Sequence, residues 1–125
     1  MTENKQNFSI KVELYDTFVG VILSKQAMKE WLIEKEEWEF IGHLDSNPVA
    51  LNLEITTSNG EWFNIIYLPG VKNLVTISHE VIHAAWNILY KKGIMVDYHN
   101  HEALTYLHDF ILNKILEEIN KQDND

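Results

Sequence analysis

Hydrophobic and polar residues alternate along the first part of the chain, which is the pattern of β-strands. Every second residue from Phe8 to Leu14 is apolar, and this spacing predicts a half-buried strand. After a turn at Asp16-Thr17, the apolar run from Phe18 to Leu23 predicts a second, more buried strand. Ser24 is a natural N-cap, and the helical spacing of the apolar residues that follow predicts a helix to about Trp38.

The middle of the chain predicts a β-hairpin. Residues 42–48 are loop-like in composition, and the alternation returns between Leu51 and Ile55. Asn59-Gly60 is a strong signal for a tight hairpin turn, because both residues tolerate the positive φ angles that such turns require. Residues 61–68 are therefore expected to form the returning strand.

The period of the apolar residues changes from two to about 3.6 after the hairpin, so the last part of the chain is predicted to be helical. One long helix is expected over residues 73–92, ended by Gly93. Residues 94–99 form a short connection to Asn100, a natural N-cap for a last helix that reaches about Ile119. This order predicts an α+β fold: a small antiparallel or mixed sheet, a long penultimate helix and a C-terminal helix.

Length and composition place these elements in one domain. The chain has 125 residues, 46% hydrophobic and 23% charged, which is typical of a globular protein. We expect a single domain over residues 1–125 with frayed ends at 1–7 and 120–125.

The charged residues and the missing residue types exclude several classes of function. The net charge is −9 and all ten bases are lysines, so no guanidinium group is present to bind phosphate or guanine. We therefore expect no nucleic acid as a partner. The absence of cysteine excludes disulfides, thiolate catalysis and cysteine-ligated metals. No apolar run is long enough to cross a bilayer and no targeting segment is visible, so we expect no membrane partner and a cytoplasmic location.

The predicted penultimate helix carries the residues with the clearest chemistry. His79-Glu80-Val81-Ile82-His83 is an HExxH motif, and residues four apart lie one turn apart on nearly the same helix face. His79 and His83 are therefore expected to hold one zinc ion together. Zinc lowers the pKa of a bound water toward about 7, and Glu80 is placed to take its proton as the catalytic general base.

A catalytic zinc needs a third protein ligand. Leu89 stands where the longer HExxHxxGxxH signature would place a third histidine, which excludes that class. The next candidate is Glu102, in the first turn of the last predicted helix. About nine helical residues after His83 cover roughly 13 Å, and the loop of about eight residues can extend to about 26 Å. The loop is therefore long enough to return Glu102 to the motif.

His79-Glu80-x-x-His83 followed by Asn100-His101-Glu102-Ala103 resembles the gluzincin branch of zinc metallopeptidases. Residues 61–116 are also similar to small zincin-like proteins encoded by tailed bacteriophages. The resemblance implies a zincin-like fold, zinc as the cofactor and His79, His83 and Glu102 as its ligands. It also implies Glu80 as the general base, a peptide or protein as the substrate, and a host-cell cytoplasm as the location of a phage-encoded protein.

The resemblance is incomplete next to the third ligand. Thermolysin-like enzymes have an aspartate four residues after the ligand glutamate, and here that position is Tyr106. The nearest aspartate is Asp109. Both residues lie on the Glu102 side of a helix, so either is a candidate for the partner that orients a metal-bound histidine.

Three residues near Glu102 are further candidates for the site. His101 is an alternative third ligand or a substrate-binding residue, although it points about 100° away from Glu102 on a helix. His99 and Tyr98 are candidates to donate hydrogen bonds to a developing oxyanion. The alternative for both loop residues is simple exposure to solvent.

The strand before the motif helix offers a place for the substrate. In zincin folds an edge strand beside the motif helix pairs with an extended peptide. Here Trp62, Ile65 and Tyr67 would line that edge, unless the strand lies inside the sheet.

Two functions follow from these residues if the motif binds a metal; if HExxH is a coincidence, only a soluble α+β domain is predicted. The first is a zinc-dependent hydrolase, a minimal metallopeptidase in which Glu80 activates a zinc-bound water. The alternative is a metal-stabilised acidic binding module that engages a host or virion protein without catalysis. An indispensable Glu80 separates the first function from the second.

Overall fold

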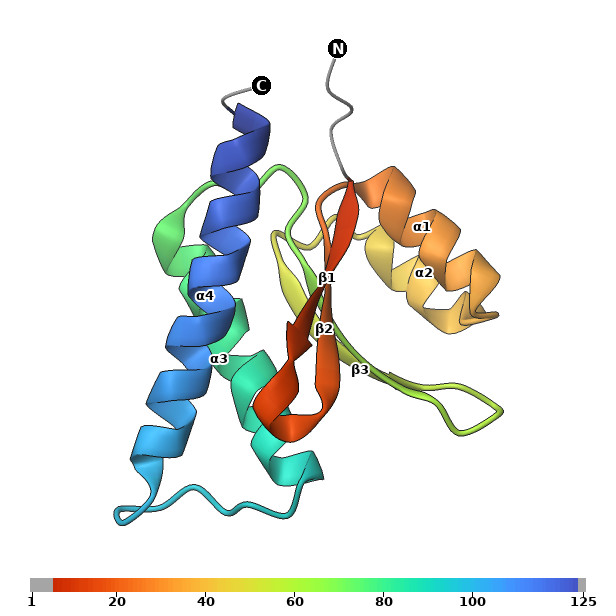
Figure 1. The fold of residues 1–125 in the computed structure, drawn as a ribbon. Coiled ribbons are helices and arrows are strands. Elements are labelled where there is room, and N and C mark those ends of the chain that lie inside the picture. Colours follow the sequence, from red (N-terminus) through yellow and green to blue (C-terminus); the bar gives the residue numbers. More distant parts are fainter. Residues whose placement is uncertain (1–5, 124–125) are drawn as a thin grey trace.

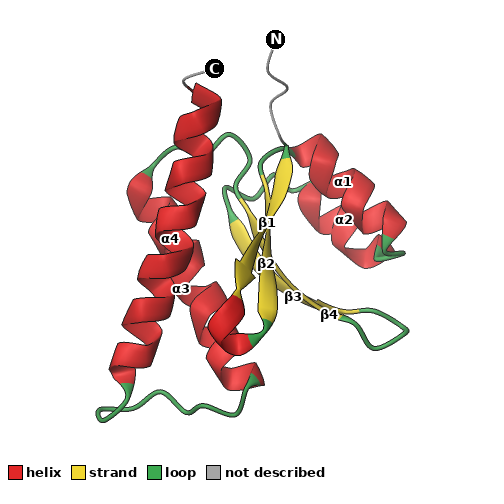
Figure 2. Ribbon diagram, viewed as in Figure 1, coloured by secondary structure: helices red, strands yellow, loops and turns green. Residues whose placement is uncertain are grey.

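A four-stranded sheet lies in the middle of the molecule, with one pair of helices on each face (Figures 1 and 2). The computed structural model describes residues 6–123. In chain order the elements are β1 (Asn7–Val12), the 3-10 turn η1 (Glu13–Tyr15), β2 (Thr17–Ile22), α1 (Lys25–Glu34), α2 (Trp38–Leu44), β3 (Leu51–Thr56), β4 (Trp62–Tyr67), α3 (Leu74–Lys91) and α4 (His101–Asp123). The α+β fold with a small mixed sheet, a long helix and a C-terminal helix is confirmed.

The strand order is β1-β2-β4-β3, so β1 and β3 are the two edges of the sheet. β1 pairs with β2 antiparallel, β2 with β4 parallel, and β3 with β4 antiparallel. A loop of residues 57–61 connects β3 to β4, and the predicted Asn59-Gly60 turn lies within it. Gly60 has a positive φ of 87°, which favours glycine. β4, which holds Trp62, Ile65 and Tyr67, is an internal strand, so these residues do not line an edge.

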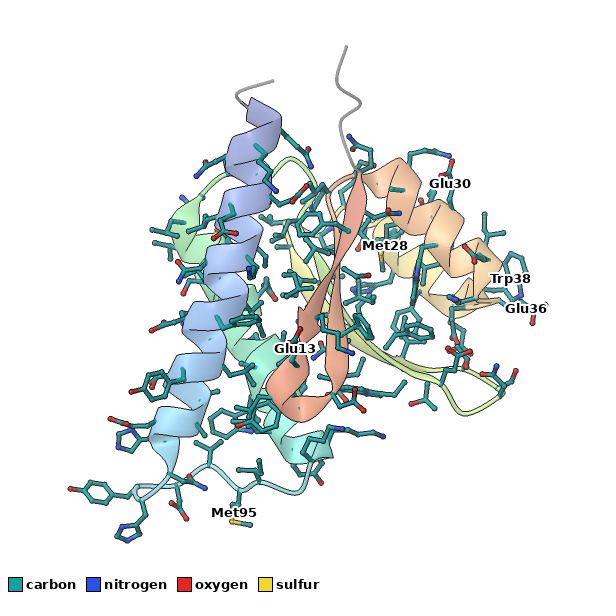
Figure 3. The ribbon with its side chains drawn as sticks, viewed as in Figure 1. Glu13, Met28, Glu30, Glu36, Trp38 and Met95 are labelled. Carbon is teal, nitrogen blue, oxygen red and sulfur yellow. The ribbon has the colours of Figure 1, made fainter. Side chains whose placement is uncertain are left out.

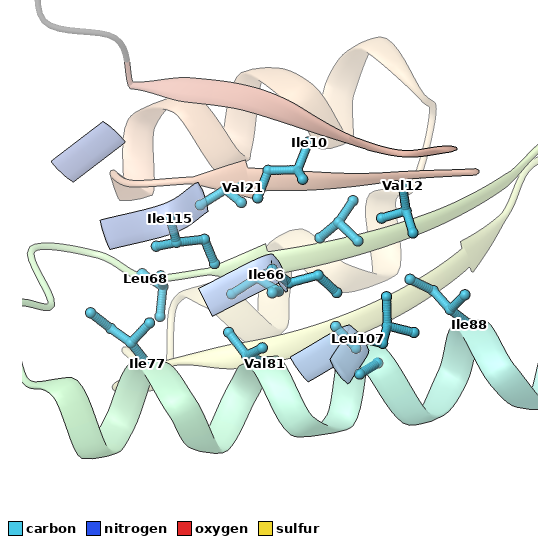
Figure 4. Packing of buried hydrophobic residues seen from close by; sticks show 14 of the residues in the cluster. Ile10, Val12, Val21, Ile66, Leu68, Ile77, Val81, Ile88, Leu107 and Ile115 are labelled. Carbon is cyan, nitrogen blue, oxygen red and sulfur yellow. The ribbon is translucent and has the colours of Figure 1, made fainter. Parts of the chain in front are cut away.

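Each face of the sheet packs against its own apolar core. On β4, Ile66 contributes to the core under α3 and α4, whereas Ile65 and Tyr67 contribute to the core under α1 and α2. Figure 4 shows Ile77 and Val81 of α3 in the first of these cores. Each such buried side chain contributes about 1.5–3 kcal/mol to folding. The two cores therefore fix the position of α3 against the sheet.

The helix predicted from Ser24 to about Trp38 is confirmed at its start, where Ser24 caps α1, but α1 ends at Glu34 because the chain breaks before α2. A straight continuation of the face that buries Met28 and Leu32 would bring charged residues into the core: Lys35, Glu36 and Glu39. The chain instead turns at Glu36, with a left-handed φ of 60°, and begins a second helix. That helix buries Leu44, which lies in residues 42–48 that were predicted as loop, while Trp38 at its start is exposed (Figure 3).

Both ends of α3 lie where the sequence predicted them, whereas Asn100 does not cap α4 with its side chain as expected. Asn73 caps α3 by accepting a hydrogen bond from the N–H of Thr76, and Gly93 ends the helix with a φ of 77°. The side chain of Asn100 accepts from the N–H of Asp97 and donates to the carbonyl of Met95. Asn100 thus orders the loop before α4 rather than capping the helix through its side chain.

The predicted frayed ends fall partly outside the described residues, namely at 1–5 and 124–125. Asn7 begins β1, and α4 continues beyond Ile119 to Asp123. Within residues 6–123 no helix has both the length and the apolar character that a membrane span needs.

Candidate metal centre

The HExxH motif lies in the first half of α3, where it divides between two sides of the helix. The buried side of α3 faces the sheet and includes Ile77, Val81 and Ala84. His79 and His83 are exposed, while Glu80 is only 8% exposed. The imidazoles therefore point to solvent, and the carboxylate lies at the border between solvent and core.

The two histidines converge on one point. Their Nε2 atoms are 3.3 Å apart, and the rings lie at 76° to each other. Two zinc–nitrogen bonds of about 2.0–2.1 Å at a tetrahedral angle separate the nitrogens by about 3.3–3.4 Å. Without a metal the same distance accommodates an N–H···N hydrogen bond between the two rings. The pair thus has the spacing of a two-histidine chelate before any metal arrives.

Glu80 has a carboxylate that no other described residue engages. No hydrogen bond or ion pair joins it to another part of residues 6–123. Its oxygens are not sealed from water, because no fully buried side-chain oxygen or nitrogen among the described residues lacks a hydrogen-bond partner. Around the helix, Glu80 lies about 100° from His79 and about 60° from His83. A carboxylate in this position is free to accept a proton from a water held in front of the histidine pair.

Asparagine side chains fix the Glu80 side of α3 against the edge strand β3. Asn87, two turns after Glu80 on the same side, donates to Asn52 Oδ1 of β3 at 2.8 Å. Asn52 donates in turn to Asn64 Oδ1 of β4 at 2.7 Å, and Asn64 donates to the carbonyl of Ala84 at 2.9 Å. Because this chain of hydrogen bonds joins β3, β4 and α3, Glu80 is held beside an open edge of the sheet.

The opposite side of α3 faces α4 through a hydrogen-bonded histidine. Ser78 Oγ lies 2.8 Å from His108 Nε2, and His108 Nδ1 lies 3.1 Å from Asp109 Oδ1. No sequence pattern singled out His108, because its separation from the motif along the chain has no meaning until α3 and α4 are packed together. Asp109, a predicted partner for a metal-bound histidine, is placed on His108 rather than on His79.

Glu102 does not join the histidine pair in this structure. It is exposed in the first turn of α4, two residues before the buried Leu104, so it points to nearly the opposite side of the helix. It is also about 120° around α4 from His108, which marks the side that faces α3. In residues 6–123 no group of three or more His, Asp or Glu side chains has the arrangement to hold a metal. The structure therefore brings together two of the three predicted ligands.

The other candidates near Glu102 lie in and after the loop between α3 and α4. His101 is seven residues before His108 and hence on the same side of α4. Its ring contacts that of Tyr98, with centroids 6.2 Å apart, and Tyr98 also contacts His99. Tyr98 is 85% exposed, and the nearby Met95 extends to solvent (Figure 3). These rings contact one another rather than His79 or His83.

Tyr106 points away from the histidine pair. It is 71% exposed and lines a groove between α4 and β1, on the side of the helix opposite His108. Tyr106 therefore lies on the wrong side of α4 to orient His79 or His83, the role predicted for it.

Comparisons with known proteins give no relative from which a function can be transferred. No model of a protein family, no curated protein and no solved structure matches this chain.

Proposed function

We propose that this protein is a zinc-dependent hydrolase, a minimal metallopeptidase of the zincin type. One observation carries the proposal: the two Nε2 atoms of His79 and His83 lie 3.3 Å apart, beside the unengaged carboxylate of Glu80. This combination supplies a metal chelate and a base on one turn of helix.

Each residue of the motif has a defined task in this proposal. His79 and His83 hold the metal through their Nε2 atoms. When bound, zinc lowers the pKa of a coordinated water toward about 7. The Glu80 carboxylate would accept a proton from a water whose oxygen attacks the peptide carbonyl carbon, and would deliver that proton to the amine nitrogen as the C–N bond breaks.

Glu102 is the third ligand that we propose, with His101 as the alternative. Both lie in the first turn of α4, directly after the loop of residues 94–100. Glu102 reaches the pair only if this turn rotates or shifts, whereas His101 already lies on the side of α4 that faces α3. The metal affinities of variants at the two positions decide between them.

The position of β3 supports a peptide as substrate. β3 is an edge strand, and the asparagine chain through Asn52 and Asn87 holds it beside the Glu80 side of α3. An extended peptide that pairs with β3 would pass beside the base. We propose that this edge takes the place of the Trp62–Tyr67 strand that the sequence pointed to. The cytoplasm, of a host cell if the chain is phage-encoded, is the location that we propose.

A metal-stabilised acidic binding module is the second candidate, and a different observation favours it. The exposed side of α3 that carries His79 and His83 also carries Val75, Trp86 and Tyr90, which are 77%, 48% and 79% exposed. An exposed apolar stripe of this kind is typical of a surface that binds another protein. In this role the metal would fix side chains on the stripe, and Glu80 would have no chemical task.

Hydrolysis by wild type and by the Glu80→Gln variant tests the proposal. The zinc-loaded proteins are incubated with a library of peptides, and new amino termini are identified by mass spectrometry. We expect cleavage by wild type and its loss in Glu80→Gln, with the zinc content of both proteins equal. Equal cleavage by both would refute the role of Glu80. No cleavage by zinc-loaded wild type would favour the binding module.

A further inference from the structure

A groove separates the edge strand β1 from α4, on the far side of α4 from the candidate metal centre. Its volume is about 800 Å³, and its walls are residues 8–15 and one side of α4 that includes Tyr106 and Phe110. Figure 1 shows α4 to the left of the sheet, on the same side as α3. A volume of this size is in the range of sites that hold a ligand.

The first wall is the open edge of β1. The N–H of Leu23 donates to the carbonyl of Gln6, while the carbonyl of Ile22 accepts from the N–H of Leu68 beyond β4. Successive residues of β2 therefore face β1 and β4 in alternation. Through the β1–β2 register, the even-numbered residues of β1 bond to β2 and the odd-numbered ones face outward. The outward residues are Asn7, Ser9 and Lys11.

The second wall is an exposed apolar surface. Tyr106 is 71% exposed, Phe110 is 40% exposed, and Leu14 at the end of the groove is 84% exposed. Beneath them lie Ile10 and Val12, which are buried side chains of β1. Apolar groups that enter the groove would thus meet aromatic and aliphatic surface while backbone groups meet the strand edge.

We propose that this groove binds an extended peptide segment of a partner protein, which adds to β1 as a fifth strand. The outward residues repeat every second position, about 6.8 Å apart, and only another extended backbone matches successive N–H and C=O groups at that spacing. Side chains at alternate positions of the peptide would face Tyr106 and Phe110, so these positions are expected to be apolar. This inference is independent of the proposed hydrolase function, because it uses no residue of the HExxH motif.

Charge decides which kind of segment fits. The three lysines that line the groove are each paired with an acid: Lys11 with Asp16 at 3.6 Å, Lys114 with Glu117 at 3.9 Å, and Lys121 with Glu118 at 3.7 Å. Glu13 has no ion pair with another described residue. Because the chain as a whole carries −9, a segment with basic residues at its ends is favoured. A second copy of this chain, which also carries −9, is disfavoured as the occupant.

Selection of peptides on the full-length chain tests the proposal. A display library of random octapeptides is selected on immobilised wild type and counter-selected on the Phe110→Ser variant. We expect the enriched peptides to be apolar at alternate positions and basic at the ends. Enrichment that is equal on both proteins, or no enrichment at all, would overturn the proposal.

The affinity of an enriched peptide that carries a fluorophore is then measured for wild type and for variants of the groove. We expect Phe110→Ser and Tyr106→Ser each to weaken binding about tenfold. Trp38→Ser, which changes a side chain of α2 that is 62% exposed, is the matched control and should bind like wild type. Circular dichroism checks that all three variants are folded. Affinities that do not differ between the groove variants and the control would place the peptide elsewhere.

Amide hydrogen exchange tests the added strand directly. In the free protein the amides of Ser9 and Lys11 should exchange faster than that of Ile10, and the peptide should slow Ser9 and Lys11 specifically. Binding without this slowing would refute pairing with β1. Sedimentation velocity should show a monomer, and a dimer that Phe110→Ser dissociates would assign the groove to a second copy instead.

Discussion

Replacing Asn64 tests whether the asparagine chain holds α3 against β3 and β4. Asn64 is only 1% exposed, accepts a hydrogen bond from Asn52 and donates one to the carbonyl of Ala84. Asn64→Ala removes both bonds, at about 1 kcal/mol each. Asn52 still donates to the carbonyl of Ile65 at 3.0 Å, so its amide is not left unpaired. The lost amide group leaves a cavity of roughly 40 Å³ that adds about 1 kcal/mol.

The expected loss is therefore about 3 kcal/mol of the free energy of unfolding. Urea denaturation followed by tryptophan fluorescence measures it, and with a slope of about 1.5 kcal/mol per molar the midpoint should fall by about 2 M. Asn120→Ala, an exposed asparagine of α4, is the control and should change stability by no more than about 0.5 kcal/mol. A loss below about 1 kcal/mol for Asn64→Ala would show that the asparagine chain does not hold the helix.

An acidic replacement at the same position adds a pH test. Asn64→Asp keeps the acceptor for Asn52, but the ionised carboxyl has no proton to donate to the carbonyl of Ala84. Burial raises the pKa of such a carboxyl above its unfolded value of about 3.9. The variant should therefore lose stability relative to wild type as the pH rises through about 4 to 7, and recover part of it on acidification. A difference from wild type that is constant with pH would contradict the buried donor.

Three further predictions concern Ser78, Tyr67 and Glu102. Ser78→Ala removes the hydrogen bond to His108 and should lower the free energy of unfolding by about 1 kcal/mol, measured by urea denaturation; no change would show that the contact does not join α3 to α4. Burial raises the pKa of Tyr67 above 10.0, so the folded protein holds this proton more tightly and stability should fall as the pH rises above about 10. Tyr67→Phe should make that fall smaller, and equal pH profiles would refute the effect. Glu102→Ala should weaken zinc binding at least tenfold in a competition assay with a chelating dye. If the zinc affinity of Glu102→Ala is unchanged and that of His101→Ala falls, His101 is the third ligand instead.

The sequence was sufficient for the features that depend on local order. Alternation over residues 8–12 and 51–55 predicted the strands β1 and β3, and Asn59-Gly60 predicted the turn that joins β3 to β4. Asn73 and Gly93 marked the limits of α3, because capping and a left-handed φ are properties of single residues. The spacing of His79 and His83 predicted their convergence, because residues four apart lie on nearly the same face of a helix.

Features that depend on packing could not be predicted from the sequence. The break after α1 follows from the position of the second core, which a straight helix would have met with Lys35, Glu36 and Glu39. The internal place of β4 depends on its parallel pairing with β2, a contact between residues about 45 positions apart.

The direction of Glu102 was also beyond the sequence. The burial of Leu104 sets the rotation of α4 about its axis, and that rotation turns Glu102 outward and His108 toward Ser78. A pattern of residues shows that two side chains share a helix face, but the neighbouring helix decides which face meets the site.

Zinc content is the measurement that tests the central claim most directly. The untagged protein is purified without added metal, dialysed against zinc at neutral pH, and analysed by native mass spectrometry beside His79→Ala, His83→Ala and, as a control, His43→Ala. We predict about one zinc per chain in wild type and His43→Ala, and its loss in both motif variants. Zinc-free wild type, or equal zinc in all four proteins, would contradict a metal centre at His79 and His83.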